Sequence, residues 1–315
     1  MLTAVSVPDI HLLRVFVAVA EAGSFSAAQI LLNVSQSTIS TQMGELEGRL
    51  GLRLCRRGRS GFSLTDDGHA VYEATKHLFR NCSDFVTKVN ARRGTLSGSV
   101  RVALADALVG NPDFPADKIF RSLRERMPNV SIVLSQADPL TIERQILEER
   151  VDAGIHTFPS HAPGLRYIEL FTERQTLYCS DAHPLFALDD RSIDPEKLEH
   201  FDYAAREYYG GSLKPGLFRP MKVTSQCTTM EGTVALILSG KFIGHIPPQS
   251  ARQWLESGRL RPIMPDRLSY DCTFESVFAA GVRLSRPLEI LEDVLSTQFG
   301  AKLAKVSDSL RAASV

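Results

Sequence analysis

The chain has 315 residues, and its 36 lysines and arginines balance 36 aspartates and glutamates, so the formal net charge is zero. This length suggests two or three domains, and 43% hydrophobic residues are enough to build buried cores. No run of about eighteen apolar residues occurs, which excludes a transmembrane helix of the usual hydrophobic kind. The five cysteines are odd in number and scattered, which argues against a disulfide framework and indicates a reducing cytoplasm.

Two predicted helices open the chain. Apolar residues recur at helical spacing over residues 10–22, and Gly23 suits the position after a helix end. The second helix covers residues 26–32 and is expected to turn both Leu31 and Leu32 toward a core. Two short helices joined by a tight turn are typical of a helix-turn-helix, whose second helix enters the major groove of DNA.

A third predicted helix follows a turn at Asn33 and carries a cluster of polar side chains. Ile39, Met43 and Leu46 keep the spacing of a buried face. The polar residues lie early in the helix and largely away from that face: Ser35, Gln36, Ser37, Thr38, Ser40, Thr41 and Gln42. Glutamine can pair with adenine through two hydrogen bonds, and hydroxyl groups reach bases or phosphates. The alternative interpretation is a solvated helix face, and the basic segment that follows favours DNA.

That basic segment, residues 52–64, predicts a β-hairpin with a glycine-containing loop. Four arginines are placed on it: Arg53, Arg56, Arg57 and Arg59. Basic side chains on a hairpin beside a reading helix form a wing that contacts phosphates.

A long helix is predicted over residues 66–92, with two aspartates in its first turn, where negative charge favours the helix dipole. An apolar stripe follows this helix: Val71, Ala74, Thr75, Leu78, Cys82, Phe85, Val86 and Val89. The stripe is too extensive for a solvated linker, so we expect this helix to form a homodimer.

Residues 16–68 resemble the amino-terminal domain of LysR-type transcriptional regulators. The matching residues are Phe16, Ala20, Gly23, Ser24, Phe25, Ala27, Ala28, Leu32, Val34, Ser35, Gln36, Ser37, Ser40, Gln42, Leu46, Glu47, Leu50, Gly51, Leu54, Leu64, Thr65 and Gly68. Two positions depart from the family pattern, since Ser37 often corresponds to proline and Thr41 to a basic residue. The resemblance implies a regulator that binds operator DNA in a sequence-specific way and responds to a small-molecule effector.

The rest of the chain alternates strands and helices after a hinge-like stretch at residues 94–99. Such alternation predicts an α/β fold with ligand sites at the carboxyl ends of strands. The resemblance implies a winged helix-turn-helix domain with a long linker helix, then a two-lobed α/β effector domain similar to periplasmic binding proteins. The expected boundaries are 1–65 for the winged helix-turn-helix, 66–93 for the linker helix, 94–166 and 269–300 for lobe I, 167–268 for lobe II, and 301–315 for a tail.

The resemblance also implies an effector cleft at strand ends from both lobes. The positions that correspond are Asp106, Ala107, Gln136, Asp138, His156, Thr157, Arg206, Tyr208, Ser225, Gln226, Cys227 and His245. Helix starts at such a cleft favour anions, and Arg206 is placed to bind a carboxylate. The negative charge of Asp106 does not fit a pocket that binds anions alone. It suits a ligand with an amine, a hydroxyl or a protonated acid group. His156 and His245 have an alternative role, because they can simply cap strand ends.

These observations together predict a cytoplasmic regulator that is not an enzyme and needs neither a cofactor nor a metal. It is expected to bind double-stranded operator DNA as a dimer or tetramer, with a small organic acid as effector. Two alternatives stay open, a redox sensor acting through Cys227, and a helix-turn-helix domain fused to a catalytic α/β unit. The chain contains no G-x-S-x-G, H-E-x-x-H or Walker sequence to support catalysis.

Overall fold

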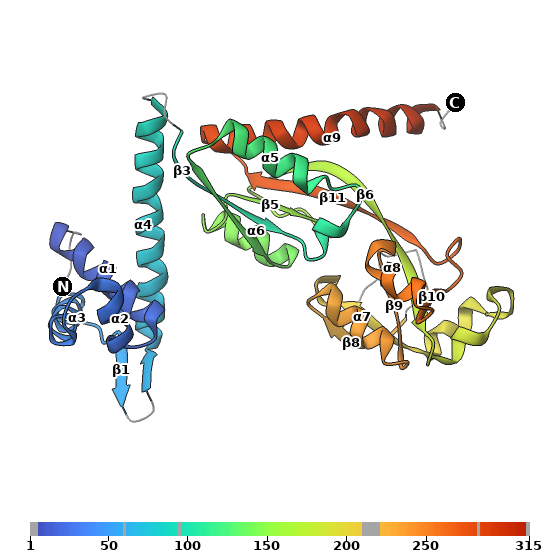
Figure 1. Ribbon diagram of the computed structural model, residues 1–315, viewed down its shortest axis with the longest axis horizontal. Coiled ribbons are helices and arrows are strands. Elements are labelled where there is room, and N and C mark those ends of the chain that lie inside the picture. The colour runs from blue at the N-terminus through green and yellow to red at the C-terminus, as the bar shows by residue number, and fades with distance from the viewer. Residues whose placement is uncertain (1–5, 59–60, 93–95, 210–220, 282–283, 313–315) are drawn as a thin grey trace. The chain divides into compact units, whose positions relative to one another are not determined.

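The computed structural model describes residues 6–58, 61–92, 96–209, 221–281 and 284–312, and it divides into two compact units, Met1–Val89 and Asn90–Val315 (Figure 1). The first unit is mostly helical, and the second is built on a mixed β-sheet. Within the described residues, no helix is both long and apolar enough to cross a membrane.

The first unit packs three helices and a two-stranded hairpin against the start of a long helix. Its elements are α1 (Val7–Ala22), α2 (Phe25–Leu32), α3 (Gln36–Leu50), β1 (Cys55–Gly58), β2 (Gly61–Leu64) and α4 (Asp66–Arg92). The side-chain oxygens of Ser24 and Ser35 start α2 and α3 by accepting hydrogen bonds from the backbone N–H groups of Ala27 (3.0 Å) and Thr38 (3.1 Å). The most deeply buried core residues are Phe16, Val19, Ala28, Ile39, Met43, Leu46 and Leu54.

The prediction that Leu31 faces the core is wrong, because its side chain is 68% exposed. Phe25 and Ala28 are buried, and Leu32 packs partly against the same core. These three residues lie three and four positions apart and therefore share one helix face. Leu31 falls outside that face, and so does Ile30, which is 83% exposed.

The hairpin is held against α4 by a close approach of two backbones. A Cβ atom on Gly68 would lie 2.0 Å from the carbonyl oxygen of Leu54, so a glycine is required there. The hydroxyl of Thr65 accepts a hydrogen bond from the Gly68 N–H (2.9 Å) and donates one to the carbonyl oxygen of Arg53 (2.6 Å). The wing is thus anchored at both of its ends.

The apolar stripe of α4 has two environments. Val71 and Leu78 pack against the three-helix core, and Thr75 is buried beside them. Farther along the helix, Phe85 is 67% exposed and Val86 is 54% exposed. One half of the stripe therefore belongs to the core of the first unit, while the other half is an apolar surface of the single chain.

The second unit has nine strands, and five α-helices lie among its described residues. The strands are β3 (Gly98–Leu104), β4 (Val130–Gln136), β5 (Ala153–His156), β6 (Leu165–Ser180), β7 (Asp202–Arg206), β8 (Lys222–Cys227), β9 (Phe242–Ile246), β10 (Leu260–Pro262) and β11 (Tyr270–Ala279). The helices are α5 (Ala116–Arg126), α6 (Pro139–Leu147), α7 (Met230–Leu238), α8 (Pro248–Glu256) and α9 (Arg286–Ala312). Short 3₁₀ turns occupy Leu108–Gly110, Pro184–Ala187, Asp190–Ser192, Pro195–His200 and Glu207–Tyr209.

The strand order β4-β3-β5-β11-β6-β9-β7-β8 contains two parallel groups that the long strands β6 and β11 connect. We call the group of β3, β4 and β5 with α5, α6 and α9 the first lobe. The second lobe comprises β7 to β10 with α7 and α8. Residues 165–175 of β6 pair antiparallel with β11, and residues 176–178 pair with β9 (Figure 1).

The alternation of the sequence predicts strands at residues 173–180 and 273–279, which are only parts of β6 and β11. The first half of β6 was missed because it carries Arg166 and Glu169, which do not fit an apolar alternation. In the structure Arg166 binds Glu292 of α9 through two hydrogen bonds of 2.9 and 2.8 Å. A tertiary ion pair thus accommodates charge in a strand that the local pattern did not favour.

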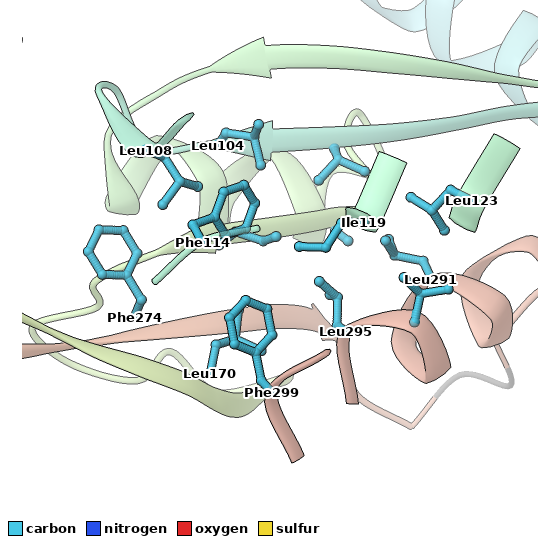
Figure 2. Close-up of a cluster of buried hydrophobic side chains, with 14 of the residues drawn as sticks. Leu104, Leu108, Phe114, Ile119, Leu123, Leu170, Phe274, Leu291, Leu295 and Phe299 are labelled. Atoms are coloured by element: carbon cyan, nitrogen blue, oxygen red, sulfur yellow. The ribbon is translucent and has the colours of Figure 1, made fainter. Parts of the chain in front are cut away.

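The core of the first lobe lies between its sheet and two helices. Figure 2 shows Ile119 and Leu123 of α5 beside Leu291 and Leu295 of α9, and Phe114 above Phe299. The Phe114 and Phe299 rings stack with centroids 6.2 Å apart. The expected helix at residues 287–299 matches the packed part of α9, which continues through residue 312 into the region expected to be a tail.

Candidate functional site

The start of α3 presents an exposed polar surface. Ser35, Gln36, Ser37, Thr38 and Thr41 are exposed, as a surface that reads DNA requires. Their hydroxyl groups also bond to one another: the Ser35 hydroxyl lies 2.7 Å from that of Ser37 and 2.8 Å from that of Thr38. The Thr41 hydroxyl donates to the carbonyl oxygen of Ser37 at 3.1 Å. Gln36 therefore has the longest exposed polar side chain at this helix start.

The other two predicted reading residues are less accessible. Ser40 and Gln42 are half-buried. The Nε2 atom of Gln42 lies 3.0 Å from Nε2 of His11, on α1. This contact between α3 and α1 gives Gln42 a structural role in addition to its position on the reading helix.

The wing is positioned by the end of the reading helix. Oε1 of Glu47, on α3, accepts hydrogen bonds from the backbone N–H groups of Leu54 (2.8 Å) and Cys55 (3.3 Å). Arg53 and Arg56 have exposed side chains beside these contacts. The side chains of Arg57 and Arg59 lie outside the described part of the structure. These hydrogen bonds connect the hairpin directly to the second half of α3.

A cavity lies between the lobes of the second unit, where the carboxyl ends of β3, β5, β7 and β9 meet. Its volume is about 40 Å³, room for only a few water molecules. The predicted residues that line it are Asp106, Ala107, His156, Thr157, Arg206, Tyr208 and His245. The lining that sequence reasoning missed comprises Ala105, Glu173, Gln175, Tyr203, Ala205, Met230, Pro247, Tyr270, Cys272 and Phe274.

The remaining predicted residues do not line this cavity, and their strands explain why. Gln136 ends β4, and Ser225, Gln226 and Cys227 belong to β8; these are the two edge strands of the sheet order. Asp138 caps α6, where its carboxylate accepts a hydrogen bond from the Thr141 N–H at 3.0 Å. The cavity is therefore formed by the ends of inner strands, which the sequence pattern could not distinguish from edge strands.

The charged centre of the cavity is an ion pair between the lobes. Nη2 of Arg206 lies 2.5 Å from Oδ1 of Asp106, and Nη1 lies 3.2 Å from Oδ2. Oδ2 also accepts a hydrogen bond from the backbone N–H of Met230, in the first turn of α7. Arg206 is 8% exposed, and its guanidinium carbon lies 5.2 Å from the centroid of the Tyr208 ring. Such a bidentate, partly desolvated pair is stronger than an exposed one.

A second buried carboxylate, Glu173 on β6, lies at the point where the chain passes between the lobes. Oε1 accepts hydrogen bonds from the side-chain amides of Asn111 (2.6 Å) and Gln249 (2.7 Å), and Oε2 accepts one from Gln175 (2.5 Å). Burial raises the pKa of Glu173 above its ordinary value, and the nearby charge of Asp106 acts in the same direction. A run of five polar residues inside β6, residues 172–176, with Glu173 and Gln175 on one face, is the sequence signal that could have pointed to this group.

Both histidines of the cavity are buried and neutral. Burial lowers the pKa of His156 to about 4, and its Nδ1 atom accepts a hydrogen bond from the Thr157 N–H at 2.7 Å. Burial also lowers the pKa of His245 to about 4. Its ring bridges the Tyr203 hydroxyl (2.9 Å) and the carbonyl oxygen of Leu268 (2.8 Å). These contacts favour the alternative in which the two histidines support strand ends.

All five cysteines are free thiols, and Cys227 is half-buried. Burial raises the pKa of Cys179 to about 11, which disfavours its reactive thiolate form. Across the described residues, no three His, Cys, Asp or Glu side chains form a group that could hold a metal ion.

Comparison with known families covers most of the chain. The model "LysR substrate binding domain" matches residues 93–299, and "Bacterial regulatory helix-turn-helix protein, lysR family" matches residues 10–69. The chain is 36% identical over 281 residues to the HTH-type transcriptional activator BauR of Pseudomonas aeruginosa, which covers 89% of this chain and 92% of that protein. It is 32% identical over 177 residues to the probable regulator LrrA of Synechococcus elongatus, covering 56% and 59%.

Solved structures agree on the fold. The crystal structure of CbnR, a LysR family transcriptional regulator, matches with a TM-score of 0.65 at 19% identity, covering 92% of this chain and 99% of that one. CbnR complexed with its target DNA matches with a TM-score of 0.64 over the same shares. The virulence activator AphB of Vibrio cholerae matches with a TM-score of 0.52 at 18% identity, covering 91% and 98%.

Proposed function

Since this chain belongs to the LysR family of DNA-binding transcriptional regulators, we propose that it binds a partly palindromic operator as an oligomer and changes its DNA contacts when a small organic acid enters the inter-lobe cavity. The family consists of regulators rather than enzymes. Its members act on chromosomal DNA, so the cytoplasm is the proposed location.

The proposed reading surface combines the start of α3 with the wing. Gln36 reaches base edges in the major groove, and the short hydroxyl side chains beside it contact bases or phosphates. Arg53 and Arg56, which are exposed, contact phosphates on either side of the groove. The solved complex of CbnR with its target DNA supports this placement by analogy of fold.

The proposed assembly is a homodimer through α4, with two dimers forming a tetramer. The exposed apolar side chains of Phe85, Val86 and Val89 support the dimer, because an apolar stripe of this kind is costly to leave in water. Two linked modules then bind the two half-sites of one operator.

The effector proposal rests mainly on Arg206, a buried guanidinium in a cavity between two lobes. Its Nε atom has no hydrogen-bond partner among the described residues. Guanidinium binds carboxylates through two parallel hydrogen bonds, and the first turn of α7 adds backbone N–H groups that favour an anion. A carboxylate held between Arg206 and α7 would be bound by the second lobe, in place of the contact that Asp106 makes from the first lobe.

Replacing Arg206 with alanine tests this site. A hydrogen bond to a charged group contributes about 1.5–3 kcal/mol, so Arg206→Ala should weaken the effector by at least about tenfold. Effector-free binding to an operator selected from random DNA should stay nearly unchanged, because the two sites communicate only through a conformational equilibrium. Titration calorimetry measures the first quantity and fluorescence anisotropy the second.

Arg174→Ala is the matched control, because Arg174 is exposed on β6 between two cavity residues. It should leave effector affinity unchanged. Wild-type effector affinity in Arg206→Ala would remove this arginine from the site.

A further inference from the structure

The inter-lobe cavity contains two carboxylates and one guanidinium, and the carboxylates have different partners. Asp106 is paired with Arg206, its Oδ1 lying 2.5 Å from Nη2. The three groups that donate to Glu173 are neutral amides, from Asn111, Gln175 and Gln249. The negative charge of Glu173 is thus solvated by dipoles, while that of Asp106 is compensated by a cation.

Asp106 occupies the place that a ligand carboxylate would take. It accepts hydrogen bonds from the Arg206 guanidinium and from the backbone N–H of Met230 at the start of α7. These are the donors that recognise carboxylates in proteins. The Asp106 carboxylate already occupies two guanidinium nitrogens and the α7 N–H group, so these donors are taken while the pair is closed. An acid must therefore displace Asp106 from Arg206 in order to bind there.

Displacement has an electrostatic consequence. Asp106 would lose its cation while remaining near Glu173, so two carboxylates would face the ligand with no positive charge between them. Like charges in a desolvated site repel, and at least one carboxylate must then gain a proton or a cation. The raised pKa of Glu173, which burial and the charge of Asp106 cause, shows that the site already disfavours the second negative charge.

We propose that the effector is a small amino acid whose carboxylate replaces that of Asp106 on Arg206, and whose ammonium group is held by Asp106 and Glu173. The ligand thereby supplies the cation that the displaced carboxylate needs. Aromatic rings of Tyr208, Tyr270 and Phe274 also line the cavity, and the Tyr208 ring already lies 5.2 Å from the Arg206 guanidinium carbon. This inference rests on the proposed function, because it names the chemical class of effector for the same site.

The test compares amino acids with their deaminated analogues on the full-length protein. A thermal-shift screen uses the α-amino acids and a series of ω-amino acids (glycine, β-alanine, γ-aminobutyrate and 5-aminovalerate). Each amino acid is paired with the monocarboxylate of the same carbon chain, because a ligand that binds only the folded state raises the melting temperature. Titration calorimetry then measures affinity for the best pair.

At least one amino acid should bind, and its monocarboxylate should bind at least about tenfold more weakly, since one charge-assisted contact is lost. Glu173→Gln should weaken the amino acid by about tenfold and should strengthen binding of the monocarboxylate, because it removes the repulsion between Glu173 and the displaced Asp106. Glu169→Gln, the same change at an exposed position of β6, should alter neither affinity. The comparison of the two ligands on the wild-type protein does not depend on the stability of the variant.

Three outcomes would overturn the proposal: no amino acid binds, the monocarboxylate binds as tightly as the amino acid, or Glu173→Gln keeps the full discrimination. The proposed function fails in a different way. A monocarboxylate that depends on Arg206 and changes operator affinity would retain the regulatory site while excluding the amino acid class. Binding that is insensitive to Arg206→Ala would instead remove the site itself.

Discussion

The reading surface of the first unit and the cavity of the second both present polar groups to a partner, but they hold those groups in opposite ways. Gln36, Arg53 and Arg56 are exposed side chains on a framework that is rigid without the partner. Arg206, Asp106 and Glu173 are largely buried and already satisfied by one another and by neighbouring amides. An exposed surface gains new contacts when it binds a partner, whereas a buried site must break existing contacts before it forms new ones.

This difference explains why a regulator contains both an exposed surface and a buried site. In the proposed function, a preformed surface would contact phosphates and base edges, which favours rapid association and strong dependence on salt. A ligand that takes the place of Asp106 on Arg206 would break the ion pair between the lobes. Binding of the ligand would therefore change the conformation of the second unit. Four substitutions test the roles of the two regions.

Phe85→Glu should abolish the proposed α4 dimer. Phe85 is 67% exposed in the single chain, so a charge there costs the monomer little, but burying it unpaired in an interface costs several kcal/mol. Light scattering should show a folded protein of lower mass, and operator affinity should fall because two half-sites need linked modules. Ser83→Glu, two positions away and exposed, is the control that should keep the oligomer. An unchanged mass with Phe85→Glu would exclude this stripe as the interface.

Gln36→Ala should weaken operator binding by about 1–3 kcal/mol and random DNA much less, because a base contact carries sequence information. Competition anisotropy with both DNAs measures the difference. Gln29→Ala makes the same chemical change at an exposed position of α2 and should affect both DNAs alike. Equal losses on operator and random DNA for Gln36→Ala would rule out base reading by this residue.

Glu173→Gln should raise the melting temperature of the unliganded protein by about a few degrees near neutral pH. The folded state raises the pKa of Glu173, so the wild-type protein is most stable when this group is protonated and loses stability as the pH rises through that pKa. The advantage of the amide should therefore shrink in mildly acidic buffer. Thermal unfolding at two pH values checks the sign, and a lower melting temperature for the variant at neutral pH would show that the buried carboxylate stabilises the fold.

Arg57→Ala should have the smallest effect, lowering affinity for all DNA sequences and reducing the salt slope by roughly one unit. Arg121→Ala, at an exposed position of α5, removes the same charge from the second unit and should leave the slope unchanged. If the slope of Arg57→Ala matches that of the wild-type protein, this arginine does not contact phosphate.

The first unit could be predicted from sequence because its signals are local. Ser24 and Ser35 start helices within three residues of the N–H groups that they cap, and Gly51, with a φ of 69°, ends α3. Leu31 was misassigned because six of the eight residues of α2 are apolar, so the pattern does not show which face is buried. Burial of Phe25 and Ala28, which decides that phase, depends on packing against α1 and α3.

The cavity was only partly predictable because its contacts are distant in sequence. Arg206 and Asp106 were predicted because the family resemblance implied an effector cleft at these positions, and in the structure each follows or ends a strand. Glu173 lies inside a strand, and its donors Asn111 and Gln249 are 62 and 76 residues away. The contacts of Glu173 with these donors can be recognised only when the strand order is known.

The two strands that cross between the lobes place the ligand at a pivot. The chain passes from one lobe to the other along β6 and returns along β11, and Glu173 and Gln175 pair there with Cys272 and Tyr270. A rotation of one lobe against the other must bend β6 and β11 where they pass between the lobes. The polar cluster of the cavity lies at this bend and not at the outer edge of the lobes. A shift of a fraction of an ångström at this bend produces a displacement at the far end of each lobe that grows with the length of the lobe. An amino acid bound at the proposed site would therefore change the conformation of the whole second unit.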